Sequence, residues 1–253
     1  MRELERDSTS DTPACKRLAI VGRGRIGYAL ATGLSAVGYA IDGPLGRGAD
    51  GRGADAVLLC VPDGEIERAA AHIVPGPLVG HCSGATGLDV LARHEAFSLH
   101  PLMTVTSEGA QFAGAGAAIA GSTQRAVDLA AELAHALGLR PVEIAEQDRA
   151  AYHAAASIAS NFLVTLEAAA ERVAGAAGVE RGLLVPLVRA TVENWARLGP
   201  ERALTGPVAR GDEATVARQR AAVDATASDL LPLFDALAEA TRGLAGAREA
   251  QPA

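Results

Sequence analysis

The spacing of apolar residues changes once along the chain, near residue 146, and this change divides the sequence into two parts. In the first part, short apolar runs alternate with segments of helical spacing, which is typical of a mostly parallel sheet with helices between its strands. Strands are predicted at residues 18–21, 39–41, 56–61, 78–82, 97–99, 115–120 and 139–144. Helices are predicted at residues 26–37, 64–73, 86–93 and 122–137, and residues 46–55 are predicted to form a loop.

In the second part of the chain the strand signals stop. Ala- and Leu-rich segments with helical spacing follow one another, at residues 147–178, 180–198, 212–226 and 227–247. We therefore predict an α/β fold, with an N-terminal Rossmann-type sheet domain at 15–146 and an all-helical domain at 147–250. The many small residues of the first long helix indicate close helix packing and a homodimer formed through this domain. Residues 1–14 are polar without an apolar period and are predicted to be a disordered tail.

The first predicted strand runs directly into a G-x-G-x-x-G motif, Gly22-Arg23-Gly24-Arg25-Ile26-Gly27. In such a motif the first glycine allows a tight turn, the second lets a pyrophosphate approach the backbone, and the third lets the helix pack against the strand. The helix N-terminus offers free N–H groups to the phosphates. Because the motif follows a strand and opens a helix, it indicates a dinucleotide site rather than a glycine-rich turn without a ligand.

The end of the second strand leaves the choice of dinucleotide open. Asp42 lies 20 positions after Gly22, where an acid would bind the ribose hydroxyls of NAD. If the strand continues to Leu45, Arg47 lies at its end and would pair with the 2′-phosphate of NADP. Pro44 argues against the longer strand, because proline removes a hydrogen-bond donor from an interior strand.

Composition and charge exclude several classes of partner. The formal net charge of −7 argues against a nucleic-acid or anionic membrane surface. No apolar run reaches membrane-spanning length, and the N-terminus does not resemble a signal peptide, so we expect a cytoplasmic protein. The three cysteines lack metal-ligand spacing, and no metal site is predicted. Lys16, the only lysine, precedes the first strand, which argues against a catalytic lysine.

Two histidines follow or end predicted strands in the first part. His81 and His100 lie at strand carboxyl ends, which face the cofactor in this class of fold, and Ser83 adds a hydroxyl next to His81. A histidine can transfer a proton near neutral pH, so His100 and Ser83 are candidate catalytic residues. The alternative for each histidine is a neutral ring that hydrogen-bonds the backbone at a strand end.

The helical part contributes further candidates. His153, Ser157 and Asn161 follow one another at i, i+4 spacing and are expected on one helix face, where they meet either a substrate or a neighbouring helix. Arg210, in a turn before a helix that Asp212 is expected to cap, could bind a substrate carboxylate. The alternative is an Arg210–Asp212 pair that holds the turn.

Several of these stretches together resemble a known family. They are VGRGRIGYALATGL, VLLCVPDGEI, HCSGATGLDVL, SLHPLMTV, YHAAASIASNFLVTL and TGPVARGD, and they span residues 17–225. The chain resembles the Rossmann-like proteins that carry a DUF2520 domain, which are related to pyrroline-5-carboxylate reductase, to F420-dependent NADP oxidoreductases and to the 6-phosphogluconate dehydrogenase-like group. That resemblance implies a Rossmann domain followed by a helical domain like the C-terminal domain of 6-phosphogluconate dehydrogenase.

The resemblance also assigns site residues by position. It implies phosphate binding by the glycine motif, and it favours Arg47 and hence NADP, with NAD or an F420-linked use favoured less. Pro62 and Asp63, with Val61 before them, match the stretch that passes beneath the cofactor riboses. Related hydroxyacid dehydrogenases carry a lysine on the first helix of the second domain. This chain lacks it there, which favours imine or ketone reduction with another proton donor.

The predicted function is that of an NADP-dependent oxidoreductase acting on a small carboxylated carbonyl, imine or hydroxy substrate. His100 or His153 would transfer the proton, with Ser83 beside them, while Asn161 and Arg210 would bind the substrate. The alternative is a non-catalytic dinucleotide-binding sensor or dimeric scaffold.

Overall fold

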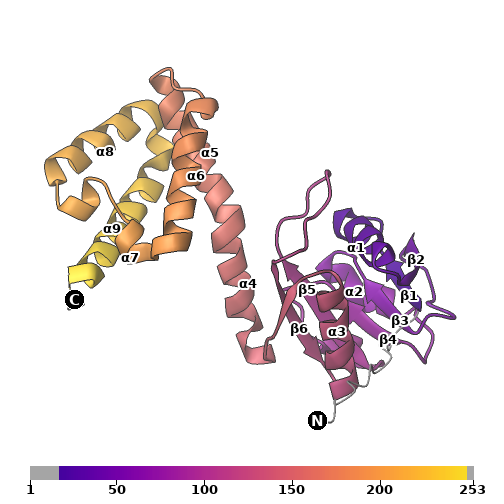
Figure 1. The fold of residues 1–253 in the computed structure, drawn as a ribbon. Helices are drawn as coiled ribbons and strands as arrows, with labels where there is room; N and C mark the ends of the chain where they lie inside the picture. The colour runs from indigo at the N-terminus through magenta and orange to yellow at the C-terminus, as the bar shows by residue number, and fades with distance from the viewer. Residues whose placement is uncertain (1–16, 250–253) are drawn as a thin grey trace, which may run out of the picture. The chain divides into compact units, whose positions relative to one another are not determined.

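The structure is a computed structural model that describes residues 17–249 and separates into two compact units (Figure 1). The first unit contains the sheet and ends at Ser160, and the second begins at Asn161. The predicted tail at residues 1–14 lies outside the described residues. Within residues 17–249, no helix is both long and apolar enough to cross a membrane.

The first unit contains one seven-stranded sheet with the strand order β2-β1-β3-β4-β5-β6-β7. All neighbouring strands are parallel except β5 and β6, which are antiparallel. This confirms the predicted mostly parallel α/β sheet. The strands are β1 (Arg17–Val21), β2 (Ala40–Leu45), β3 (Ala56–Leu59), β4 (Leu78–His81), β5 (Ala96–Leu102), β6 (Gly116–Gly121) and β7 (Arg140–Glu143).

Strand β2 takes the longer of its two predicted forms and reaches Leu45. Its register against β1 shifts between the Ala19–Asp42 pair and the Val21–Leu45 pair, so that Gly43 and Pro44 together oppose a single residue of β1. Pro44 is tolerated because β2 is an edge strand and the proline lies in this irregularity.

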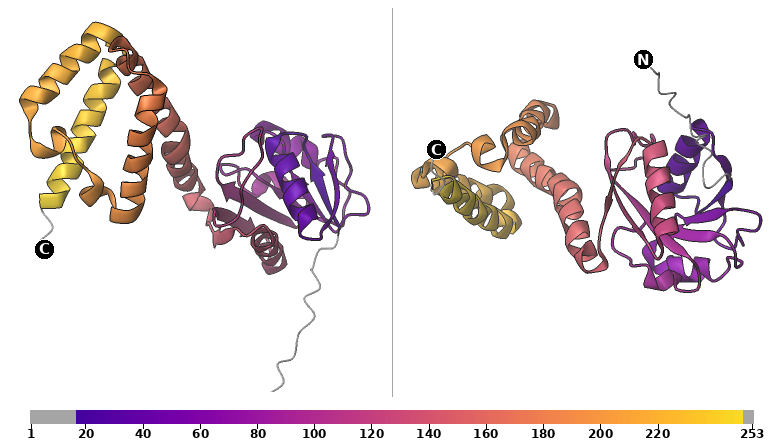
Figure 2. Two further views of the ribbon diagram at one scale, coloured as in Figure 1. Left: turned by 45° about the horizontal axis from the view of Figure 1, so that its top comes forward. Right: turned by 60° about the horizontal axis from the view of Figure 1, so that its bottom comes forward.

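Helices cover both faces of the sheet, because side chains of each buried strand alternate between two apolar clusters. Leu18 and Ile20 of β1 pack on the face covered by α1 (Arg25–Ala36) and α3 (Gln124–Ala136). Ala19 and Val21 pack on the opposite face with α2 (Ile66–Ala70). Figure 2 shows the indigo helix α1 lying across the strands.

Two predicted helices of the first unit differ from the structure. The helix predicted at residues 86–93 is wrong, because only a 3-10 turn at Asp89–Leu91 forms there. The Ser83 hydroxyl accepts hydrogen bonds from the N–H groups of Ala85 and Thr86, and these bonds stabilise a turn. The helix predicted at 64–73 is shorter, with a 3-10 turn at Asp63–Glu65 before α2.

The chain continues from the sheet into helices, as the sequence predicts. The first predicted long helix is divided by a π-helical turn at Ile158–Phe162, a feature that the residue pattern does not indicate. In the second unit, a short 3-10 turn at Val208–Arg210 precedes α8, whose N-cap is Asp212 as predicted. The helices after the sheet are α4 (Arg149–Ser157), α5 (Leu163–Ala176), α6 (Arg181–Leu198), α7 (Pro200–Ala203), α8 (Glu213–Ala227) and α9 (Leu231–Glu249).

Candidate active site

The glycine motif forms the turn between β1 and α1, and two of its glycines are required by close packing. Gly22 has φ = +125°, and a Cβ atom there would collide with the carbonyl oxygen of Cys60 just after β3. A Cβ on Gly27 would collide with the carbonyl oxygen of Gly22. The loop therefore packs closely on the end of β3. The strand order reverses between β1 and β3, and open α/β sheets bind ligands at such a point.

Gly24 has a different role, because it faces open space. A Cβ on Gly24 would meet no heavy atom within 4 Å, and this residue is the N-cap of α1 without a side-chain hydrogen bond. The first turn of α1 contains no acidic residue. A backbone that leaves this space beside uncapped helix N–H groups fits the pyrophosphate of a dinucleotide.

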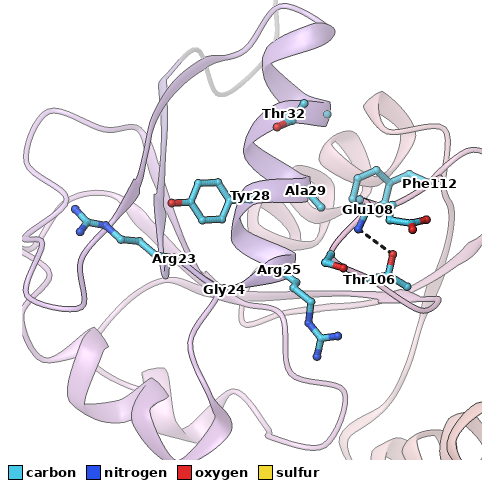
Figure 3. A pocket seen from close by; sticks show the side chains of 13 residues that line it. Arg23, Gly24, Arg25, Tyr28, Ala29, Thr32, Thr106, Glu108 and Phe112 are labelled. Carbon is cyan, nitrogen blue, oxygen red and sulfur yellow. Dashed lines mark hydrogen bonds between the residues drawn. The ribbon is translucent and has the colours of Figure 1, made fainter.

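A cavity of about 620 Å³ opens beside this loop, between α1 and the connection from β5 to β6 (Figure 3). Arg23 and Arg25 line it, and their side chains leave the start of α1 in different directions. Neither arginine forms a salt bridge with another residue in the range 17–249. Thr106 and Glu108 line the opposite wall. Arg23 and Arg25, which the sequence places among the cofactor-binding residues, are therefore exposed at a hollow next to the glycine loop.

The end of β2 places Arg47 and Asp42 differently relative to the glycine loop. Leu45 is level with the last residue of β1, and its carbonyl oxygen accepts a hydrogen bond of 2.9 Å from Gly22 N–H. Arg47 follows two residues later, beyond the strand end. Asp42 is level with Ala19, in the middle of β1. Only Arg47 therefore lies past the carboxyl end of β2.

Both side chains take part in exposed ion pairs. Arg47 lies 3.4 Å from the carboxylate of Glu65, which also pairs with Arg68 of α2. Asp42 lies 3.8 Å from Arg17. Exposed pairs of this kind contribute little to stability, so Arg47 can exchange Glu65 for a phosphate at small cost.

Strand β3 ends at Leu59, so Val61 follows the strand instead of belonging to it as predicted, and Pro62 and Asp63 come after it. Asp63 contacts the loop after β4. Ser83 Oγ lies 2.8 Å from an Asp63 carboxylate oxygen and donates to it. The same hydroxyl also lies 3.0 Å from Thr86 Oγ1 and accepts two backbone hydrogen bonds. These contacts give Ser83 a structural role in the turn, while its predicted catalytic role stays a prediction.

His81 is fully buried and serves the same turn. Its Nδ1 accepts from Ser83 N–H at 3.2 Å, and its Nε2 lies 3.1 Å from the carbonyl oxygen of Gly87. These partners require a neutral ring with the proton on Nε2. Burial lowers its pKa, which agrees with this form. Of the two alternatives for His81, the structure therefore favours the ring bonded to backbone.

His100 lies in β5, two residues beyond Ser98, where the parallel pairing with β4 ends. Its Nδ1 is 2.7 Å from the Tyr152 hydroxyl of α4, and the two rings meet edge to face. The centroid of the His153 ring is 6.2 Å from that of His100. A Cβ on Gly84 would lie within 3 Å of both imidazoles. The structure thus brings together His100 and His153, with Gly84 packed against them.

The environment keeps the His100 imidazole and the Tyr152 hydroxyl uncharged near neutral pH. Burial, followed by the neighbouring His153 and Arg149, lowers the pKa of His100 to about 4, although Asp63 acts in the opposite direction. Burial raises the pKa of the Tyr152 hydroxyl above its ordinary value. A neutral imidazole and a protonated phenol can share one hydrogen bond, in which the Tyr152 hydroxyl donates to Nδ1 and Nε2 is left to carry the ring proton.

Arg149 is a site residue that the sequence analysis missed. It is 2% exposed, and its Nη2 donates to Ser98 Oγ at 3.1 Å. Tyr152 was also not identified as the partner of His100. A single arginine one helical turn before a Tyr-His pair, in an otherwise alanine-rich segment, is the signal that the sequence offers for both residues.

The other predicted substrate residues belong to the second unit. Asn161 lies in the π-helical turn, a feature often found at functional sites, and it is exposed. Arg210 is exposed at the end of the 3-10 turn before α8. Their place in a site with His100 stays a prediction.

The thiols of Cys60 and Cys82 are free and lie 3.7 Å apart, with Cys60 directly beneath the glycine loop. In the described part of the chain, no group of three or more histidine, cysteine, aspartate or glutamate side chains is arranged to hold a metal ion.

Comparison with known proteins identifies the family of the chain. The model of the family described as "Domain of unknown function (DUF2520)" matches residues 115–241, half of the chain, and the chain belongs to this family. No curated protein matches the sequence.

Several solved structures share the fold at low sequence identity. A Bacteroides fragilis protein proposed to be an NADP oxidoreductase has a TM-score of 0.77 and 17% identity, over 90% of this chain and 98% of its own. The protein TM1727 from Thermotoga maritima has a TM-score of 0.74 and 22% identity, over 92% and 99%. Plasmodium falciparum pyrroline carboxylate reductase, solved with NADP bound, has a TM-score of 0.59 and 14% identity, over 92% and 99%.

Proposed function

We propose that this member of the DUF2520 family is an NADP-dependent oxidoreductase that acts on a small carboxylated carbonyl, imine or hydroxy substrate. The observation that carries the proposal is the juxtaposition, at the carboxyl edge of one sheet, of an open glycine loop and a neutral His100–Tyr152 pair. The similar solved structures support it, because they include an NADP-bound reductase and a proposed NADP oxidoreductase.

The residues present fit the dinucleotide. Gly24 leaves space beside the uncapped N-terminus of α1 for the pyrophosphate, and Arg23 and Arg25 supply positive charge there. Arg47, beyond the end of β2, is positioned for a 2′-phosphate, which favours NADP over NAD. Val61, Pro62 and Asp63 would pass beneath the riboses. When bound, NADP supplies hydride transfer to or from the substrate carbon.

Side chains of the protein supply the proton that the reduction requires. A carbonyl or imine that gains a hydride also needs one proton on its oxygen or nitrogen. Because His100 is neutral, its Nδ1 can accept the Tyr152 hydrogen bond while Nε2 carries a proton. We assign proton delivery to His100: Nε2 gives its proton to the substrate while Nδ1 takes the proton of Tyr152, so the imidazole stays neutral and the phenolate regains a proton from solvent after the reaction. His153 is the neighbouring alternative. Asn161 and Arg210 are the proposed groups for the substrate carboxylate.

The test is turnover of NADPH, followed by loss of its absorbance, with a panel of small keto acids and carboxylated cyclic imines. Oxidation with one class is expected, and Tyr152→Phe and His100→Ala should each lower turnover by about 10²-fold or more. Tyr39→Phe is the matched control, because the Tyr39 hydroxyl also makes a 2.7 Å hydrogen bond, to Glu132, away from the site. Binding of NADPH without turnover of any panel member would favour the dinucleotide sensor instead.

We further propose that the chain forms a homodimer through its helical unit. Large apolar side chains of α6 support this, since Leu183 and Leu187 are each at least 65% exposed and Trp195 is 58% exposed. Sedimentation of the wild-type protein should show a dimer, and Leu187→Glu should shift it toward the monomer. A wild-type monomer at all concentrations would contradict the dimer.

A further inference from the structure

Arg149 is a buried cation whose partners do not fully compensate its charge. Its side chain is 3% exposed, and the one described hydrogen bond of its guanidinium goes to the neutral hydroxyl of Ser98. Its Nε lies 3.5 Å from a carboxylate oxygen of Glu146, a side chain that is 65% exposed, and has no hydrogen-bond partner among the described residues. A buried charge held in this way is costly for stability alone.

The position of Arg149 links it to the His100–Tyr152 pair. Arg149 and Tyr152 are three residues apart on α4 and therefore lie on neighbouring positions of one helix face. Their partners Ser98 and His100 are two residues apart on β5 and therefore point to the same side of the sheet. The two hydrogen bonds, Arg149 to Ser98 and Tyr152 to His100, together tie the first turn of α4 to β5.

We propose that Arg149 is a positioning residue for proton transfer: it fixes the start of α4 on β5 and holds a buried positive charge near the Tyr152 hydroxyl. The phenol then releases its proton more readily to His100. The catalytic meaning of this inference rests on the proposed function, whereas the effect on Tyr152 is a property of the chain alone.

The electrostatic environment agrees with this role. The positive charge of Arg149 lowers the pKa of Tyr152, of His100 and of His81, while burial is the largest influence on each of the three. The other groups that act on His100 are Asp63, which raises its pKa, and His153 and His81, which lower it. Two groups oppose the effect of burial on Tyr152: a hydrogen bond with the backbone of Ala118, which lowers its pKa most, and then the positive charge of Arg149.

The experiment is a titration of phenolate absorbance in the absence of cofactor and substrate. The chain has three tyrosines, so the difference between each protein and its Tyr152→Phe counterpart isolates the titration of Tyr152. Arg149→Met should raise the pKa of Tyr152 by about one unit, because it removes the charge but keeps an apolar stem of similar length. Arg125→Met on α3 is the matched control and should leave it unchanged, because Arg125 pairs with Glu95 at the surface.

Arg149→Lys separates charge from shape. It should keep the pKa of Tyr152 near the wild-type value, because the charge remains, while turnover falls at nearly constant KM because the bond to Ser98 is lost. An unchanged pKa of Tyr152 in a folded Arg149→Met protein would overturn the proposal. If Arg149→Met fails to fold, a pKa in Arg149→Lys raised by about one unit would overturn it. Absence of turnover in the wild type would contradict the proposed function but leave this titration interpretable.

Discussion

The glycine loop and a group of side chains around His100 lie at the same edge of one sheet, but they form in different ways. This His100 group consists of Ser98, His100, Arg149 and Tyr152. The loop is made of adjacent residues, and its shape follows from where a side chain cannot fit, as at Gly22. The His100 group is made of side chains from β5 and α4 that are 51 and 52 residues apart in sequence. The loop therefore depends on the conformation of its own backbone, whereas the His100 group depends on how α4 packs on β5.

The largest effect should come from the backbone of the loop. Gly22→Ala should lower the free energy of unfolding by about 2–4 kcal/mol, because alanine is strained at φ = +125° and its Cβ would collide with the Cys60 carbonyl. Gly24→Ala should change stability by less than about 0.5 kcal/mol, because its Cβ would meet open space. Urea unfolding of the two variants measures this difference.

The same pair of variants distinguishes structure from binding. Gly24→Ala should weaken NADPH binding at least about tenfold, or about 1.4 kcal/mol, because the new methyl group occupies the space of the pyrophosphate. A Gly24→Ala protein that binds NADPH like the wild type would show that the open space at Gly24 is not where the pyrophosphate binds.

The burial of His100 should make the free energy of unfolding depend on pH. His100 has a pKa of about 4 in the folded chain and an ordinary value of 6.5, so the unfolded chain binds more protons between these values. The free energy of unfolding should therefore rise with pH from about 4 to 6.5, and fall as the solution is acidified through that range. Buried His81 acts in the same direction, so His100→Gln should reduce this slope without abolishing it.

Urea unfolding at several pH values in this range measures the slope for both proteins. An equal slope in wild type and His100→Gln would mean that His100 titrates normally and is not held neutral by its surroundings.

A smaller effect is expected at the edge of the loop. Arg47→Ala should reduce a preference for NADPH over NADH about tenfold, with little change in stability, because its ion pair with Glu65 is exposed. Asp42→Ala is the matched control, since Asp42 lies level with the middle of β1. Loss of cofactor preference in Asp42→Ala but not in Arg47→Ala would contradict the role of Arg47 and would show that Asp42 determines which dinucleotide binds.

The sequence predicts the loop side of this comparison well because its signals are local. The seven strands, the glycine motif and the cap at Asp212 each depend on residues within a few positions. The helix predicted at 86–93 failed because the Ser83 hydroxyl bonds the backbone of Ala85 and Thr86, a competition that spacing does not reveal.

The docking of α4 could not be predicted from local pattern. Nothing near Arg149 indicates that Ser98 is its partner, and nothing near His100 indicates a tyrosine 52 residues later. The sequence identified His100 and His153 from their types and places. The hydrogen bond between His100 and Tyr152 is a property of tertiary packing.

The most direct measurement is an equilibrium titration of the wild-type protein with NADPH and, separately, with NADH, followed by calorimetry. Saturable binding of NADPH that is tighter than binding of NADH is the predicted result, because the glycine loop, Arg23, Arg25 and Arg47 all follow the carboxyl ends of β1 and β2 and supply space and positive charge there. Absence of saturable binding of either dinucleotide would contradict the assignment of this edge as a cofactor site, and with it the proposed oxidoreductase.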